Sequence, residues 1–188
     1  DFVNDEWDLH AERHADAPET AMTHLVMRPG RLFCAAWCEG LRSLDLASGA
    51  WTVWDPSARE GTSHGAPPAS NDTTAGIDGA GHALWWVTQT QVHRRDAAGK
   101  FKTRKIDVGT SSENFIHCLA ARSETEIWLG TDAGLQVLAD WTAGTWLSYE
   151  RTGASAPGRV VARRDGLEVG VHPLASMLPD NRTRCIAH

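Results

Sequence analysis

The sequence predicts an all-β fold, a β-propeller of four-stranded antiparallel blades, from three observations. First, segments of one plan follow each other along the chain, over Thr23–Asp55, Thr73–Asp107 and Asn114–Glu150. Second, each segment holds four short runs of strand-forming residues with Gly, Asp or Pro turns between them, which is typical of antiparallel meanders. Third, the second run of each segment is apolar throughout, whereas the later runs are more polar. That gradient is expected when sheets stack face to face around an axis and bury their inner strands on both faces.

We expect four strands in the same order within each segment. The first strands cover 24–27, 74–77 and 115–120, and the second cover 32–36, 84–88 and 127–131. The third cover 40–46, 91–96 and 134–140, and the fourth cover 51–55, 101–107 and 145–150. An aromatic residue stands second in each of the second strands, at Phe33, Trp85 and Trp128. This recurrence favours a propeller over an immunoglobulin-like sandwich, whose strands do not repeat in fours with one aromatic pattern.

The spacing of equivalent positions supports the repeat. Leu32, Leu84 and Ile127 open the second strands and lie 52 and 43 residues apart. The longer first interval is explained by an insertion over 56–71, rich in Pro, Gly and Ser, which is the one long connection without strand pattern. Connections of that length are usually functional or disordered.

A fourth copy begins at Gly158 with a strand, a turn over 164–166 and a second strand that starts near Leu167. The following stretch, 171–181, is too short for two more strands. Asn4–His10 resembles the fourth strand of a preceding blade, or a strand that completes the last blade and closes a ring; both alternatives stay open, as does a larger ring of which this chain is a part. The predicted blades cover about 21–57, 72–109, 114–153 and 158–188 of a single propeller domain or partial propeller over 1–188.

Charge and composition argue against nucleic acid or a membrane as the main partner. The net charge is −6, and no apolar run approaches the roughly 20 residues of a membrane-spanning helix. The densest basic cluster lies on a predicted hairpin and is interpreted as a solvated strand face; it comprises Arg94, Arg95, Lys100, Lys102, Arg104 and Lys105. Four cysteines lie in apolar segments, which favours buried thiols and a cytoplasmic location, with a periplasmic or extracellular one left open.

No constellation of reactive residues emerges, and we expect no cofactor, no metal site and no catalytic residue. His10 and His14 have helical metal-ligand spacing but lack the glutamate of the zincin motif. Cys34 and Cys38 lack two further ligands at zinc spacing. An enzyme reading, a lyase or hydrolase, would rest on histidines of the predicted inner strands, His24 and His117.

One copy resembles a known repeat. Ile127–Trp146 is similar to the two-component-regulator propeller repeat, in which a strand with Trp is followed by Gly-Thr, a short gap and Gly-Leu; the matching residues are Trp128, Gly130, Thr131, Gly134 and Leu135. The other copies keep less of it: Gly40-Leu41 in the first, Thr88 and Val92 in the second. The resemblance implies a propeller and a sensor or interaction module in a larger regulatory protein.

The predicted function is therefore protein binding without catalysis. Loops between second and third strands share one face of a propeller with the blade connectors, and this top face is the expected site for a protein partner. The candidate binding residues are Trp37, Glu39, His64, Gln89 and Asp132. Trp37 packing beneath the insertion is an equal alternative. A carbohydrate-binding propeller, using exposed tryptophans such as Trp54 and Trp141, is a further one.

Overall fold

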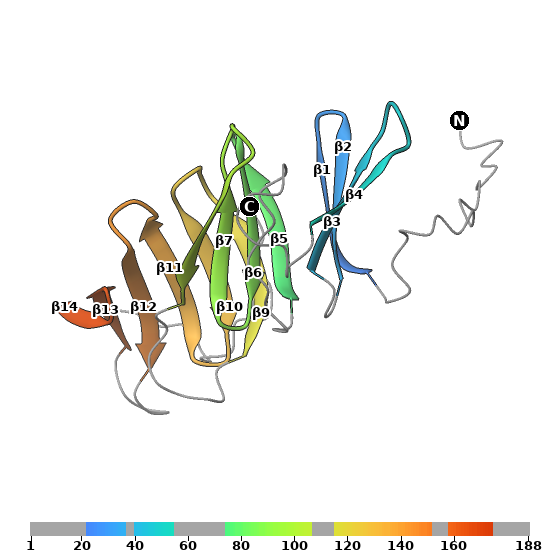
Figure 1. Cartoon of the computed structure of the whole chain (residues 1–188). Coiled ribbons are helices and arrows are strands. Elements are labelled where there is room, and N and C mark those ends of the chain that lie inside the picture. The colour runs from blue at the N-terminus through green and yellow to red at the C-terminus, as the bar shows by residue number, and fades with distance from the viewer. Residues whose placement is uncertain (1–21, 37–39, 55–73, 107–114, 152–157, 175–188) are drawn as a thin grey trace, which may run out of the picture.

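The computed structural model describes residues 22–36, 40–54, 74–106, 115–151 and 158–174, and these form three antiparallel sheets (Figure 1). The first sheet comprises β1 (Met22–Arg28), β2 (Arg31–Ala36), β3 (Gly40–Asp45) and β4 (Trp51–Trp54). The second comprises β5 (Thr74–Ala80), β6 (Ala83–Thr88), β7 (Gln91–Arg95) and β8 (Phe101–Lys105). The third comprises β9 (Ile116–Ala121), β10 (Ile127–Thr131), β11 (Gly134–Asp140), β12 (Thr145–Arg151), β13 (Gly158–Arg164) and β14 (Leu167–Pro173). The all-β propeller fold predicted from the repeat is confirmed.

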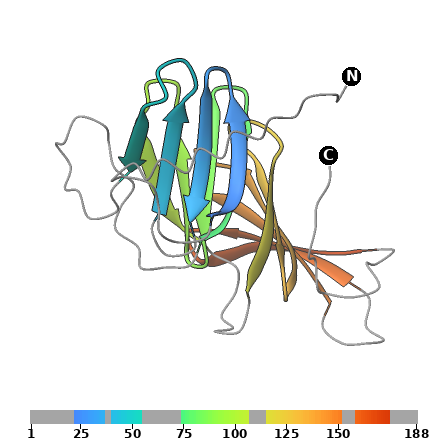
Figure 2. The same ribbon diagram turned by 90° about the vertical axis from the view of Figure 1, so that its right-hand side faces the viewer.

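The sheets stack side by side through their first strands, with β5 against both β1 and β9 (Figures 1 and 2). Gly76 of β5 makes the approach to β9 possible, because a Cβ there would lie 2.8 Å from the Cβ of Leu119. Two apolar cores fill the spaces between the sheets. Leu84 and Trp86 of β6 face the first sheet, whereas Trp85 and Val87 face the third. Every residue of β6 is therefore buried, which is why its sequence does not alternate.

The strand register preserves the equivalence read from the sequence. Leu32, Leu84 and Ile127 each pair with a residue of the following strand, which are Leu44, Arg95 and Leu138. Position by position, the three sheets can therefore be compared as copies of one unit.

The threonine of the Gly-Thr pattern fastens the turn between the second and third strands. The Thr131 hydroxyl donates to the Gly134 carbonyl at 2.8 Å and accepts from the backbone N–H of Ala133 at 3.1 Å. Thr88 occupies the equivalent position, and its hydroxyl accepts from the N–H of Gln91 at 3.1 Å. Both threonine side chains are buried. Their hydroxyls therefore form hydrogen bonds with turn backbone groups that water would otherwise form.

Polar contacts join neighbouring sheets at the ends of the inner strands. The Asp78 carboxylate accepts from the N–H of Ala121 at 2.7 Å, which links β5 to β9. The Arg28 guanidinium donates to the Gly81 carbonyl, from the first sheet to the second. The Glu124 carboxylate accepts from the N–H of His82 at 2.7 Å, from the third sheet to the second.

The fourth copy differs from the expected separate blade. Its two strands and turn lie where the sequence places them, with Asp165 and Gly166 at positive φ in a tight Asp-Gly turn. However, β13 pairs antiparallel with β12 over its whole length, so β13 and β14 extend the outer edge of the third sheet. The physical reason is backbone pairing: β12 offers an open edge, and a hairpin added there satisfies its N–H and C=O groups. The candidate strand over 4–10, the insertion over 56–71 and the segment 175–188 lie outside the described residues.

Candidate functional site

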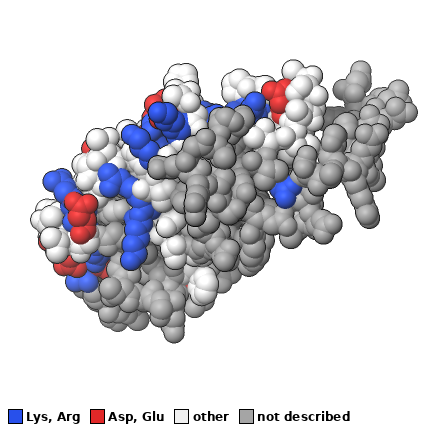
Figure 3. Space-filling view, in the orientation of Figure 1, with Lys and Arg blue, Asp and Glu red and all other residues white. Residues whose placement is uncertain are grey.

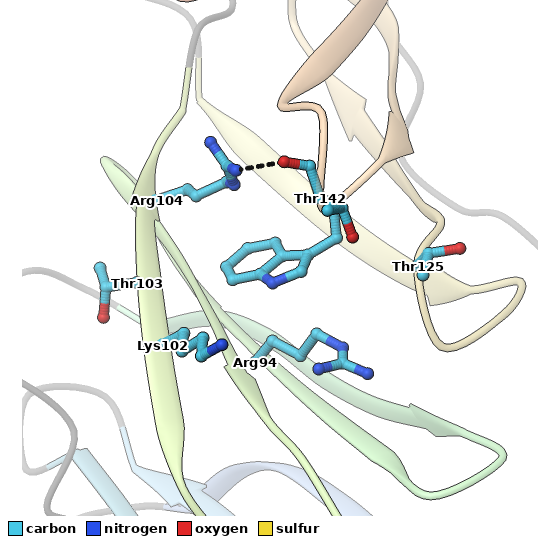
Figure 4. A pocket seen from close by; sticks show the side chains of 7 residues that line it. Arg94, Lys102, Thr103, Arg104, Thr125 and Thr142 are labelled. Atoms are coloured by element: carbon cyan, nitrogen blue, oxygen red, sulfur yellow. Dashed lines mark hydrogen bonds between the residues drawn. The ribbon is translucent and has the colours of Figure 1, made fainter.

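A groove of about 510 Å³ opens between the second and third sheets. Strands β7 and β8 form one wall, and the turns β9–β10 and β11–β12 form the other (Figure 4). Its lining consists of Arg94, Lys102, Thr103, Arg104, Thr125, Trp141 and Thr142. We call this the cationic groove, since three of its seven lining residues carry positive charge. Figure 3 shows a band of Lys and Arg side chains on the face of the molecule that carries β7 and β11.

The Trp141 indole lies between the two sheets and orients Arg104. Its ring meets that of Trp85 edge to face, with centroids 5.3 Å apart. The Arg104 guanidinium lies 5.2 Å from the Trp141 ring centroid and donates to the Thr142 carbonyl at 3.0 Å (Figure 4). Gly144 leaves the space for that guanidinium, because a Cβ there would stand 2.7 Å from its nitrogen. Arg104 is thus held in place while still lining the groove.

Arg94 is the most enclosed of the three cations. Its Nε donates to the Glu124 carbonyl at 2.6 Å, its Nη2 lies 3.7 Å from the Glu124 carboxylate, and its guanidinium lies 5.7 Å from the Trp85 ring centroid. Within the described part of the chain, neither Lys102 nor Arg104 has a carboxylate within ion-pair distance. The groove therefore carries net positive charge on a protein whose total charge is negative.

In sequence, the pattern of this cluster favours the interpretation of a solvated strand face, and none of the predicted binding residues lies in it. Lys102 and Lys105 are exposed, as that interpretation expects. What it could not show is that Trp141, more than 30 residues further along the chain, packs beside Arg104 and closes a groove. The alternation of basic residues with Phe101 was the one available signal.

Of the predicted top-face residues, Gln89 joins two sheets. Its side-chain amide donates to the Ile116 carbonyl at 3.1 Å, and its carbonyl accepts from the Ile116 N–H at 2.8 Å. Both polar atoms of the amide are therefore engaged in holding β9 against the end of β6. Trp37, Glu39 and His64 lie outside the described residues, as does the insertion that was expected to join them.

Asp132, the other described candidate, pairs with a histidine. Its carboxylate lies 2.9 Å from Nε2 of His117, and its N–H donates to the Phe115 carbonyl at 3.1 Å. Phe115 is largely exposed. The structure thus brings together, at the start of β9, one predicted binding residue, one histidine of the enzyme alternative and an exposed aromatic ring.

The other residues of the enzyme and metal-site alternatives are divided between the first and third sheets. His24 contacts the Thr23 hydroxyl at 3.0 Å, and burial holds the pKa of its imidazole below the ordinary value. Burial has the opposite effect on the Cys34 thiol and raises its pKa. Neither Cys34 nor Cys118 forms a disulfide. Among the described residues, no group of three or more His, Cys, Asp and Glu side chains is placed to hold a metal ion. The described part contains no helix long and apolar enough to cross a membrane.

Trp141 is not the exposed tryptophan that the carbohydrate alternative assumed. It is 7% exposed, because the second sheet and Arg104 enclose it. The side chain of Trp54 lies outside the description.

The fold of this chain, unlike its sequence, has counterparts among known proteins. No known protein family matches it, and no curated protein is similar to it in sequence. Solved structures share its fold. The computationally designed Ika4 protein is 14% identical with a TM-score of 0.52, over 85% of this chain and 95% of Ika4. The extracellular domain of the putative hybrid two-component system BT4673 from B. thetaiotaomicron is 17% identical with a TM-score of 0.51, over 89% of this chain and 25% of that one.

This chain thus spans about a quarter of the BT4673 domain. At these identities the likeness concerns the fold alone. It supports a propeller-like repeat fold and leaves the function to be argued from this chain's own residues.

Proposed function

We propose that this chain is a non-catalytic protein-interaction module and that its cationic groove binds an acidic segment of a partner protein. The observation that supports the proposal is the grouping of Arg94, Lys102 and Arg104 around Trp141. Charged groups placed on opposite partners steer encounter and set specificity. The Trp141 ring is 7% exposed and contributes by holding the Arg104 guanidinium in the groove.

The geometry favours carboxylates as the recognised groups. A guanidinium offers planar, forked donors that match a carboxylate, and Arg104 is already held by the Trp141 ring and the Thr142 carbonyl. Lys102 adds a mobile donor on the same strand. Since Arg104 is held in place before binding, less of its conformational entropy is lost on association.

Two finer statements belong to the same proposal. We propose that the repeats are of the two-component-regulator type, on the strength of the copy over Ile127–Trp146, and that the module acts as a sensor or scaffold within a larger regulatory assembly. The cytoplasmic location stays a prediction.

The test uses a fluorescein-labelled peptide of alternating Glu and Ala as the probe. Fluorescence anisotropy should show saturable binding to the wild-type chain that weakens as salt rises, because salt screens exposed charges. Lys102→Glu should weaken binding by about tenfold or more, corresponding to at least about 1.4 kcal/mol. Lys105→Glu is the matched control: it makes the same charge change on the same exposed strand, outside the groove lining. Equal losses in both variants, or no binding by the wild type, would contradict the groove.

A second surface for the same function is the top face, favoured by the exposed Phe115 beside the His117–Asp132 pair. An exposed aromatic ring is a common anchor in protein interfaces. For any protein partner identified, Phe115→Ser and Lys102→Glu separate the two surfaces. A loss of affinity with Phe115→Ser alone assigns the partner to the top face, and a loss with Lys102→Glu alone assigns it to the groove.

A further inference from the structure

The face of the first sheet that points away from the second sheet carries exposed apolar side chains, beside Arg42 and beside Cys34, which is 2% exposed. Leu25 and Met27 of β1 are each 60% exposed. Beside them, Leu32, Leu44 and Trp51 form a row across three strands through direct pairing, and all three are half-buried. Exposed apolar side chains that gather on one face often mark an interaction site.

The equivalent rows of the other two sheets are covered by a preceding sheet. In the second sheet, Leu84 and Phe101 pack on the first sheet, and Arg95 lies 5.9 Å from the Phe33 ring centroid. In the third sheet, the row is buried against the second sheet; it consists of Ile127, Leu138 and Trp146. Ile77, which corresponds to Leu25 by strand register, is only 8% exposed. In the second and third sheets, this face therefore packs against the preceding sheet.

The third sheet carries the residues that are equivalent to the other side of this contact. Phe33 with Leu41, and Trp85 with Val92, are buried against the sheet that follows each of them. Their equivalents on the far face of the third sheet are Trp128 and Leu135, which are only half-buried. The added hairpin β13–β14 extends the outer edge of that sheet, whereas Trp128 and Leu135 lie on β10 and β11.

We propose that two copies of this chain associate head to tail, with the far face of the third sheet of one copy packed on the open face of the first sheet of the other. The chain presents both halves of a contact that it already makes twice internally, between the first and second sheets and between the second and third. Such a contact is heterologous, and it ends growth only when the ring closes. Propellers typically close with about four to eight blades, so two copies of three sheets reach a closing number and one copy does not.

This association is independent of the cationic groove, which lies between two sheets of one copy. A loss of either function leaves the other in place, and the variants below keep all groove residues.

The test is the molar mass of the full 188-residue chain in solution, by light scattering and sedimentation. The wild type should be a dimer at micromolar concentration. Leu25→Glu should give a monomer, because a charge at the centre of an apolar contact is desolvated without a partner. Val171→Glu is the control, since Val171 is also exposed but lies on the outermost strand of the third sheet. Circular dichroism confirms that each variant remains folded.

Mixing distinguishes head-to-tail contact from a symmetric one. Leu135→Glu removes the far face of the third sheet, and a mixture of Leu25→Glu and Leu135→Glu chains retains one intact contact. Mixed dimers should form where each variant alone is monomeric. A dimer of first-sheet faces alone would not be restored by mixing, and that result would overturn the proposal. A monomeric wild type would also overturn the proposal. Leu25 would then be covered by another part of a chain or by a different partner.

Discussion

The second sheet and the first sheet are built from the same repeat but meet different surroundings. The second sheet is covered on both faces, so Leu84, Trp85 and Trp86 are almost completely buried. In the first sheet, Phe33 faces the second sheet and is buried, whereas Leu25 on the opposite face is exposed. Both sheets have the same strand order and the same antiparallel register.

The repeat therefore specifies which residues are able to pack against a neighbouring sheet. Whether such a residue is buried depends on the presence of that sheet. His93 of the second sheet makes the point for a polar residue. It is fully buried because its ring stacks on Trp86 at 4.4 Å between centroids and its Nδ1 lies 2.9 Å from the Thr103 hydroxyl. A buried histidine needs such partners, and the covered sheet provides them.

The largest expected effect comes from one substitution made at equivalent positions of the two sheets. Leu84→Ala should destabilise the fold by about 2–5 kcal/mol, because it opens a cavity at a side chain that is 2% exposed. Leu32→Ala should cost less than about half of that, because the half-buried site can relax toward solvent. Urea unfolding at submicromolar concentration gives both free energies of unfolding.

An equal loss of unfolding free energy in Leu84→Ala and Leu32→Ala would show that the first and second sheets do not differ in packing at this position. A Leu32→Ala cost that rises with protein concentration would sharpen it, because a second copy would then supply the missing cover.

A smaller effect is expected at the junction of the second and third sheets. Gln89→Leu removes both hydrogen bonds to the Ile116 backbone and leaves that N–H and C=O enclosed without a partner, at a cost of about 1–3 kcal/mol. Gln89→Glu tests the donor alone, since the carboxylate retains an acceptor for the Ile116 N–H. Hydrogen exchange at Ile116 should speed up in Gln89→Leu; unchanged protection there would remove Gln89 as the link between the sheets.

The smallest effect is a pH dependence in the first sheet. Burial holds the pKa of His24 below its ordinary value of 6.5, so the unfolded chain binds this proton more readily than the folded one. Stability should therefore fall as pH drops below about 6.5 and level off once the folded-state pKa is passed. The difference in free energy of unfolding between wild type and His24→Asn, followed from pH 7.5 to about 5, isolates this group. A difference that stays constant with pH would show that His24 titrates alike in both states.

The fold was predictable because each repeat carries its own strand and turn signals. The Asp-Gly turn at 165–166 and the apolar strand over 83–88 were both readable from neighbours in sequence. The cationic groove was not predictable, since Arg104 and Trp141 meet only when two sheets stack. The top face was predicted from strand order, and Asp132 and Gln89 were its described candidates. The structure places Asp132 next to Phe115, whose ring is exposed, and joins two sheets through the Gln89 amide. A glutamine in a short loop gives no sequence signal of a partner 27 residues away.

By itself, the sequence determined the unit of this protein: four strands, an inner strand apolar on both faces, and threonines at the turns after β6 and β10. These features follow from local propensity and from a period that repeats along the chain. Only the tertiary structure decided which faces are covered, where a groove opens and which sheet receives the last hairpin. Those outcomes depend on contacts between strands distant in sequence, and β12 accepted β13 because a free strand edge accepts any backbone that reaches it in register. The first strands are the clearest case, since only the stacked structure shows that Leu25 of β1 is exposed while its equivalent in β5, Ile77, is buried.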